Sequence, residues 1–182
     1  MKIAGTGSRK LANHPGLMHT VMLELRDMLL VEKAKHDKLE VISGMAEGFD
    51  EVIAYAAMIA SVPFHAYIPN DGYGDYYWAK NSVTGRDRIQ DWNKLISAAA
   101  SVQYICNGIY QNGIHSNFVR NCAMVEDSDY LWALVNKEMV DNANSLIALK
   151  IRKLGPGTKH CVDYARSVGR DIRFIELDVD LN

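Results

Sequence analysis

The chain has 182 residues, of which 48% are hydrophobic and 23% charged, and its formal net charge is −2 at pH 7. This length supports one globular domain with a sizeable core, and the composition is that of an ordinary soluble protein. The slightly acidic balance argues against tight, non-specific binding of nucleic acid, although it leaves room for a local basic patch.

The cysteine pattern and the apolar runs indicate the cellular compartment in which the protein is expected. Cys106, Cys122 and Cys161 are odd in number, lie far apart and form no C-x-x-C motif, so we expect free thiols in a reducing cytosol. The N-terminus enters a strand without a signal peptide, and no apolar run is long enough to span a bilayer. We therefore expect a cytoplasmic protein with no membrane partner.

Short apolar runs alternate with amphipathic segments along the chain. The runs predict strands at residues 1–4, 39–42, 62–69, 101–106, 129–135 and 173–177. The amphipathic segments predict helices at residues 16–35, 52–60, 91–100, 118–127, 136–153 and 160–168. This alternation predicts an α/β protein with a Rossmann-like three-layer fold, in which helices cover both faces of a mainly parallel sheet.

Two loops in this order have less regular patterns. Residues 107–117 are rich in glycine and are predicted to be irregular. Residues 70–75 form a turn-rich loop after the third strand, and Tyr76, Tyr77 and Trp78 follow it. These aromatic rings could stack on a base or could anchor the loop on the domain, and the sequence leaves both alternatives open.

The most informative stretch is residues 42–50, Ile-Ser-Gly-Met-Ala-Glu-Gly-Phe-Asp, between the second strand and the next helix. A strand that passes through glycines into a helix N-terminus presents free N–H groups and the positive end of the helix dipole. Gly44 and Gly48 are expected to let the backbone approach a ligand closely. Asp50 falls in the first helical turn, where it could cap the helix, pair with the dipole or contact a ligand hydroxyl.

Three further elements are expected at the same edge of the sheet. Gly5-Thr6-Gly7-Ser8-Arg9 follows the first strand, and its glycines, hydroxyls and arginine suit a phosphate or carboxylate. The other two elements are the Arg120-Asn121 pair and the turn at residues 155–158. Because right-handed crossovers bring the carboxyl ends of parallel strands together, these elements predict one ligand site.

Taken in order, these motifs resemble the motif series of the SLOG superfamily, which includes the Smf DNA-processing proteins and the LONELY GUY phosphoribohydrolases. The series here is G-T-G-S-R from Gly5, S-G-M-A-E-G-F-D from Ser43, Arg120-Asn121 with Met124, Asp129, and G-P-G-T from Gly155. It is most similar to the YpsA-like branch. The resemblance spans nearly the whole chain and implies a single SLOG-like nucleotide-binding domain over residues 1–182.

The resemblance assigns the site residue by residue. Gly7, Ser8 and Arg9 are expected to touch a phosphate or ribose, and Gly157 and Thr158 match the turn that cradles phosphate. Together with the residue patterns, it gives a full set of expected ligand-binding residues. These are Gly5, Gly7, Ser8, Arg9, Ser43, Gly44, Glu47, Gly48, Asp50, Arg120, Asn121, Gly155, Gly157 and Thr158.

Two departures from the family pattern matter. The phosphoribohydrolases place acidic residues after the last glycine turn, whereas here Thr158 is followed by Lys159, His160 and Cys161, which puts N-glycoside hydrolysis in doubt. In addition, Pro156 replaces the middle glycine of G-G-T, and residues 136–153 form an inserted helix where the family has a shorter link. This helix is expected to cover the site or to build an oligomer interface.

Three functions follow as hypotheses. The first is binding of a nucleotide or nucleotide-derived ligand by a sensor or carrier module that requires no cofactor. The second is hydrolysis of an N-glycosidic or phosphoester bond, with Glu47 and Asp50 as the acid–base candidates. The third is single-stranded DNA binding, which the acidic balance disfavours.

Metal chemistry and thiol catalysis are not expected. The six histidines form no H-x-x-x-H pair, and Cys122 and Cys161 fall on apolar helix faces. A homodimer is expected by analogy with folds of this class.

Overall fold

A computed structural model describes residues 1–136 and 154–177 of the chain. Its main sheet has six strands in the order β4-β3-β2-β1-β7-β8, and every neighbouring pair is parallel. These strands are β1 (Lys2–Thr6), β2 (Glu40–Ser43), β3 (Phe64–Ile68), β4 (Ser101–Tyr104), β7 (Tyr130–Asn136) and β8 (Asp171–Leu177). The predicted parallel α/β sheet is thereby confirmed.

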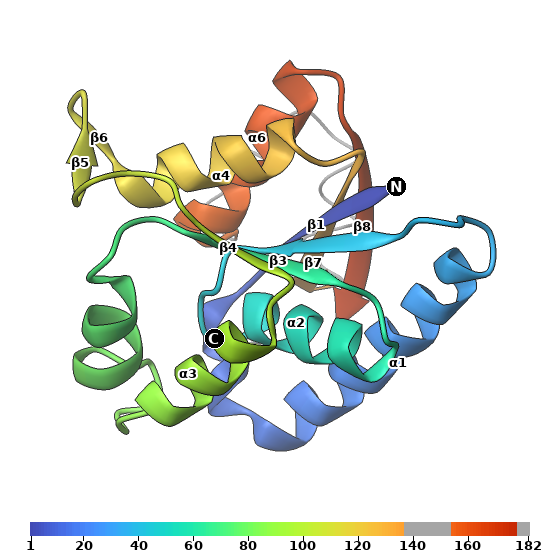
Figure 1. Ribbon diagram of the computed structural model, residues 1–182, viewed down its shortest axis with the longest axis horizontal. Helices are drawn as coiled ribbons and strands as arrows, with labels where there is room; N and C mark the ends of the chain where they lie inside the picture. The colour runs from blue at the N-terminus through green and yellow to red at the C-terminus, as the bar shows by residue number, and fades with distance from the viewer. Residues whose placement is uncertain (137–153, 178–182) are drawn as a thin grey trace.

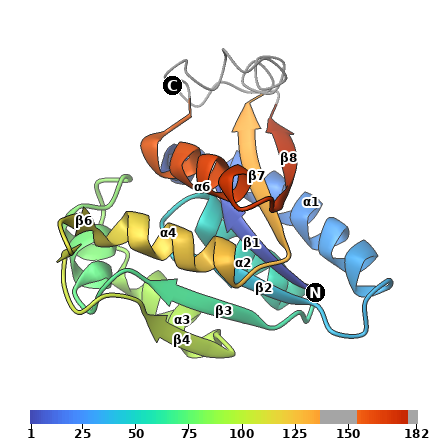
Figure 2. The same cartoon turned by 90° about the horizontal axis from the view of Figure 1, so that it is seen from above.

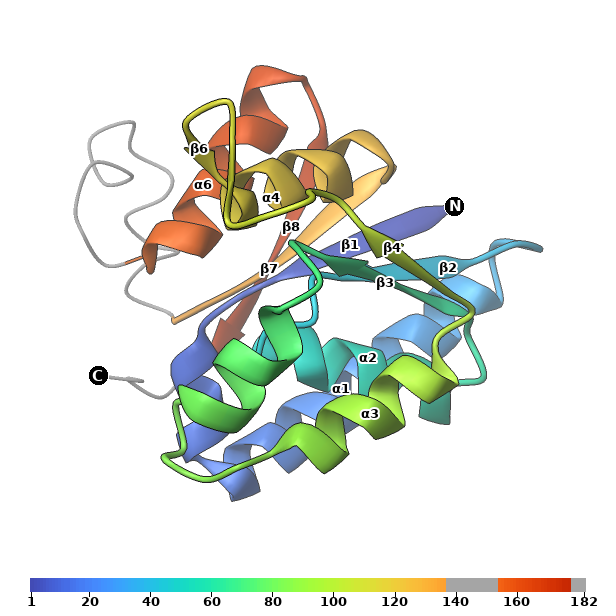
Figure 3. The same ribbon diagram turned by 60° about the vertical axis from the view of Figure 1, so that its left-hand side comes forward.

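Helices cover both faces of this sheet, as Figures 1 and 3 show. One face is covered by α1 (Pro15–Lys33), α2 (Phe49–Ile59) and α3 (Ile89–Ala98). The opposite face is covered by α4 (Ser116–Glu126) and α6 (Pro156–Ser167). Each face has its own cluster of buried apolar side chains, so the predicted three layers are confirmed.

The helix sequences explain how the helices pack. In α1, Val21, Leu25 and Leu29 recur at four-residue spacing and are fully buried, which leaves the other faces of this helix to solvent. α2 is buried around almost its whole circumference, because it lies between the sheet and α1. Its alanines, Ala54, Ala56 and Ala57, have no exposed surface, and their small side chains allow this close approach.

Several elements begin or end at residues other than those predicted. β1 continues to Thr6, because Gly5 and Thr6 still pair with Ser43 of β2 and Ala133 of β7. α6 begins at Pro156 and not at residue 160, since proline is well suited to a first helical position. The helix predicted at residues 136–153 lies outside the described residues, apart from Asn136, which is the last residue of β7.

Some elements were not predicted at all. A 3₁₀ helix, η1 (Arg9–Asn13), follows β1, and a π-helix, η2 (Asp75–Lys80), follows β3. The stretch predicted as irregular contains an antiparallel hairpin, β5 (Tyr110–Gln111) and β6 (Ile114–His115). Asn112 and Gly113 turn this hairpin with φ of 52° and 78°, the left-handed values that an Asn-Gly pair supports.

The strand order creates a switch point beside β1. From β1 the chain builds outward through β2 and β3 to β4, whereas β7 and β8 lie on the other side of β1 (Figure 2). In open α/β sheets of this kind, ligands bind in the crevice beyond the carboxyl ends of the strands at the switch point. The topology therefore predicts a ligand site beyond the carboxyl ends of β1 and β7.

Candidate functional site

A cavity of about 660 Å³ opens at this switch point. The end of β1 with the start of η1 lines one wall, and Leu134 and Val135 of β7 line another. The first turns of α2, α4 and α6 complete the cavity, together with Tyr73 and Tyr77 from the segment after β3. Ten of the fourteen predicted ligand-binding residues line it: Gly5, Gly7, Ser8, Arg9, Asp50, Arg120, Asn121, Gly155, Gly157 and Thr158.

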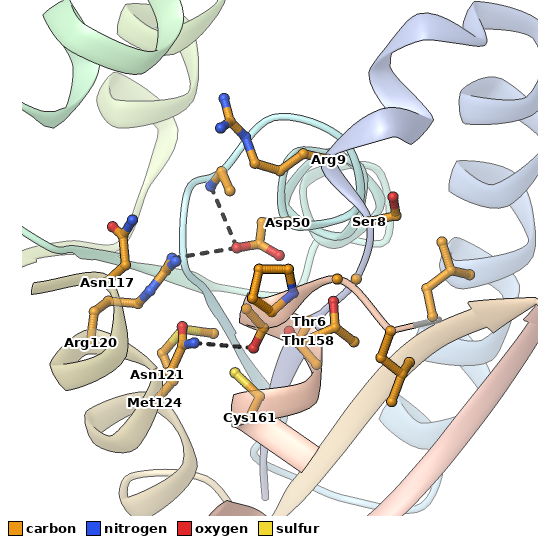
Figure 4. Close-up of a pocket in the computed structure, with 18 of the residues that line it drawn as sticks. Thr6, Ser8, Arg9, Asp50, Asn117, Arg120, Asn121, Met124, Thr158 and Cys161 are labelled. Carbon is orange, nitrogen blue, oxygen red and sulfur yellow. Dashed lines mark hydrogen bonds and ion pairs between the residues drawn. The ribbon is translucent and has the colours of Figure 1, made fainter. Parts of the chain in front are cut away.

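Asp50 and Arg120 form a buried pair on one side of the cavity, and their side chains point toward each other in Figure 4. The Asp50 Oδ2 atom lies 3.4 Å from the Arg120 Nη1 atom and 3.4 Å from the Ala46 backbone nitrogen. Both residues are only 6% exposed. Burial raises the pKa of Asp50 to about 6, although the positive charge of Arg120 opposes the shift.

The loop after β1 brings a second cation to the cavity. The Arg9 Nη2 atom donates to the Glu47 carboxylate at 3.1 Å, and its guanidinium lies 4.8 Å from the centre of the Tyr77 ring. Ser8 begins η1, because its hydroxyl accepts a hydrogen bond from the Lys10 backbone nitrogen. Arg9 is thus held in place by an ion pair and an aromatic ring at the cavity wall.

The start of α6 forms the opposite wall. No side chain among the described residues caps this helix, and no acidic residue lies in its first turn. Gly155, Pro156 and Gly157 are exposed, while Thr158 is buried. The Asn121 side chain donates to the Gly157 carbonyl at 3.2 Å and so ties α4 to this turn (Figure 4).

The glycines at the site have two different roles. A Cβ at Gly7 would lie 2.5 Å from the Phe49 Cβ atom and 2.9 Å from the Leu134 Cβ atom, so this position is glycine because the protein packs against it. By contrast, a Cβ at Gly155 or Gly157 would meet nothing within 4 Å. Packing therefore does not require the glycines at the start of α6, and they leave the helix N-terminus open to the cavity.

Four predicted residues do not line the cavity, namely Ser43, Gly44, Glu47 and Gly48. The structure gives the two glycines a packing role within the protein. A Cβ at Gly44 would overlap the Arg120 guanidinium, and one at Gly48, where φ is 83°, would overlap the Ser8 carbonyl. They make room for parts of the protein itself. Ser43 also acts locally, because its hydroxyl donates to the Asp50 carbonyl at 2.7 Å.

Glu47 is buried under the loop that follows β3. Its carboxylate accepts hydrogen bonds from Arg9, from the Ser82 hydroxyl at 2.5 Å and from the Val83 backbone nitrogen at 2.8 Å. This carboxylate therefore links the turn after β2 to residues 82–83. Of the two predicted acid–base candidates, Asp50 is the one that lines the cavity.

Several cavity residues were absent from the predicted set, among them Thr6, Asn117, Tyr73 and Tyr77. Asn117 had a signal in the sequence, because it shares one helix face with Arg120, Asn121 and Met124 at a spacing of three, four and seven residues. Tyr77 belongs to the aromatic run for which the sequence left base stacking and loop anchoring open, whereas Tyr73 had no local signal.

The cavity offers little for metal or thiol chemistry. Within residues 1–136 and 154–177, no group of three or more His, Cys, Asp or Glu side chains could hold a metal ion. Cys161 lines the cavity, but burial raises its pKa to about 12, so its thiol stays protonated at neutral pH. Among the described helices, none is both long and apolar enough to cross a membrane.

These features define a Rossmann-like α/β protein with a cavity at its switch point. No protein-family model matches the chain, and no curated protein matches its sequence. Among solved structures, the chain is similar to the X-ray structure of DNA processing protein A (DprA) from Streptococcus pneumoniae. The TM-score is 0.54 and the sequence identity is 18%. The match covers 99% of this chain and 52% of that one, so the chain spans about half the length of DprA. The likeness establishes the fold.

Proposed function

We propose that the cavity binds a nucleotide or nucleotide-derived small molecule. The observation that supports this best is the uncapped N-terminus of α6, which opens onto a cavity that Arg9, Lys10 and Arg120 also line. Free N–H groups at a helix N-terminus, together with nearby guanidinium groups, favour a phosphate. Asp50 is the one carboxylate among the described lining residues, so the wall is cationic on balance.

The rest of the cavity suits the other parts of a nucleotide. Its volume of about 660 Å³ lies within the range of roughly 300–1,000 Å³ that is usual for small-molecule sites. The Asp50 carboxylate is positioned in the first turn of α2, where it could accept a hydrogen bond from a ribose hydroxyl. Tyr77, His115 and Phe118 provide aromatic surface for a base.

The same features support a family assignment as part of the proposal. The order of the motifs and the Rossmann-like fold both fit a distant relationship to the SLOG superfamily, with the YpsA-like branch as the finer assignment. A nucleotide ligand would be in keeping with that relationship, and the site as proposed requires no further cofactor.

The start of α6 offers a direct test with a matched control. Gly157→Val is expected to weaken nucleotide binding at least tenfold, because the valine side chain would project into open space beside the free N–H groups. Gly16→Val is the control, since Pro15-Gly16 begins α1 as Pro156-Gly157 begins α6, and Gly16 also has nothing within 4 Å. Both variants are expected to fold with nearly unchanged melting temperatures.

The measurement is a thermal-shift screen followed by titration calorimetry with AMP, NAD and ADP-ribose. A ligand that binds only the folded state raises the melting temperature, so about 1 mM of a good ligand should give a clear shift. Absence of any shift would reject the proposal. Equal affinity in the wild type and Gly157→Val would place the ligand away from α6.

A hydrolase is the second candidate, and the raised pKa of Asp50 favours it. A carboxyl group with a pKa of about 6 can donate or accept a proton near neutral pH. If a bound nucleotide loses its base or phosphate, Asp50→Asn should slow turnover by roughly a hundredfold. Asp71→Asn, on an exposed loop, is the control and should be as active as the wild type. Product analysis by liquid chromatography checks both, and full activity of Asp50→Asn would exclude this role.

Nucleic acid is the third candidate, because the protein of similar fold is a DNA processing protein. A single-stranded oligonucleotide therefore belongs in the same screen. Binding that weakens steeply as salt rises would indicate contacts to several phosphates and would favour this candidate over a small molecule.

A further inference from the structure

The longest uncharged part of the chain lies on its surface. No Asp, Glu, Lys or Arg occurs between Lys94 and Arg120, although 25 residues at the average charged content of this chain would hold about six. More than half of the residues in the central part of this stretch, 103–114, are exposed. An exposed surface without charge is unusual, because charged side chains normally cover the solvent face of a protein.

Large apolar side chains are concentrated in the same stretch. Tyr104, Ile109, Tyr110 and Ile114 are 57%, 58%, 67% and 53% exposed, and they lie within eleven residues of one another. We call these four residues, with the outer edge of β4, the uncharged surface. Exposed aromatic and aliphatic groups without charges have the composition of the core of a protein interface.

Hydrogen bonds hold the uncharged surface on the domain. The Asn112-Gly113 turn closes the β5–β6 hairpin, and the Ser116 nitrogen donates to the Ile109 carbonyl at 2.8 Å at its base. The Ser116 hydroxyl also accepts a hydrogen bond from the buried Asn70 side chain at 2.9 Å. The hairpin projects from the body of the domain beyond α4, as Figure 1 shows.

The chain runs into this hairpin directly from β4, which is the last strand at one edge of the sheet. Within the part of the chain that the structure describes, no strand pairs with the outer side of β4. Its four residues, Ser101 to Tyr104, include no proline and no lysine. Soluble proteins commonly place proline or lysine on an edge strand to prevent it from pairing. Because β4 has neither, its outer edge is available for pairing with another chain.

We propose that the uncharged surface is a two-fold interface with a second copy of this chain. In a two-fold interface the same patch meets itself, so a charge at the axis would face its own copy, and an uncharged patch avoids that repulsion. A nucleic acid or an acidic partner would require cations, which this stretch lacks. A β4 edge in each copy could pair across the axis and extend the sheet. The proposal stands independently of the ligand in the cavity.

Lysine substitutions test the interface without disturbing the core. Wild-type protein is expected to be a dimer in sedimentation-velocity experiments, with little change between about 0.05 and 0.5 M salt, because the contacts are uncharged. The double variant Tyr104→Lys/Tyr110→Lys is expected to weaken dimerisation at least a hundredfold, since it places like charges across the axis. Its melting temperature at low concentration should equal that of the wild type, because both side chains are exposed.

Tyr76→Lys is the matched control. Tyr76 is 53% exposed, lies on η2, and receives the same chemical change, so this variant should remain a dimer. A wild-type protein that is monomeric at all concentrations would overturn the proposal. So would a dimer that the double variant does not weaken, or one that Tyr76→Lys weakens equally.

Discussion

Replacing Arg120 with methionine is expected to lower the free energy of unfolding by about 3–5 kcal/mol at pH 7.5, since the change leaves a buried charge without its partner. Asp50 would lose the guanidinium that lies 3.4 Å from its Oδ2 atom. The Gly44 carbonyl would lose its hydrogen bond from the Arg120 Nη1 atom. Methionine keeps most of the side-chain length, so the loss reports on charge more than on packing.

The loss should depend on pH in a definite direction. Burial raises the pKa of Asp50 from its ordinary value of 3.8 to about 6, so the folded protein binds this proton more tightly than the unfolded chain does. The contribution of Asp50 to stability is therefore fully present below pH 3.8 and is lost as the pH rises through 6. Because Arg120 lowers this pKa, its removal shifts protonation to still higher pH.

Urea unfolding at pH 7.5 and pH 5 measures the effect. The difference between wild type and Arg120→Met should shrink at pH 5, where the variant carries a neutral Asp50. Arg86→Met is the control, since Arg86 is exposed and its loss should change stability by less than about 0.5 kcal/mol. A deficit that is equal at both pH values would contradict the assigned coupling between Arg120 and Asp50.

Replacing Trp78 with alanine is expected to cost about 3–5 kcal/mol, the usual range for a large aromatic side chain removed from a core. Trp78 has no exposed surface, and its ring packs 5.7 Å from Trp92, measured between ring centres. Its Nε1 atom donates to the Met45 carbonyl at 2.9 Å. Met45 has a φ of 57°, a left-handed conformation that an ordinary side chain adopts only when its surroundings hold it there.

Trp78→Phe separates these contributions. Phenylalanine keeps much of the apolar volume but removes the donor, which leaves the Met45 carbonyl unpaired at a cost of about 1–3 kcal/mol. Tyr76→Ala is the control on the same element, because Tyr76 is largely exposed and should contribute little. Thermal and urea unfolding measure the stability of the three proteins, which should decrease from wild type to Trp78→Phe to Trp78→Ala. Equal stability of all three would show that η2 does not support the turn after β2.

The sequence was sufficient for features that depend on near neighbours. The four-residue spacing of Val21, Leu25 and Leu29 favours one buried face of a helix, and the alternation of apolar runs with amphipathic segments predicts the parallel sheet. Asn112-Gly113 is a further local signal for a hairpin, within a stretch whose glycine content favoured irregular structure. The glycine turns also indicated the edge of the sheet where the cavity lies, because the handedness of the crossovers decides where the strand ends meet.

The candidate site depends on contacts between residues that lie far apart in the sequence. The pairing of Asp50 with Arg120 joins residues 70 positions apart, and no local pattern states that the two side chains are buried together. The same holds for Glu47, a predicted acid–base candidate whose carboxylate accepts hydrogen bonds from Ser82 and Val83.

The sequence by itself therefore determined the fold class, the order of the elements and the edge of the sheet where the cavity lies. These follow from hydrophobic period and turn chemistry within a few residues. Only the tertiary structure decided which polar groups face the cavity and which are used within the protein. Burial, charge pairing and close packing at Gly7, Gly44 and Gly48 depend on residues brought together from distant parts of the chain.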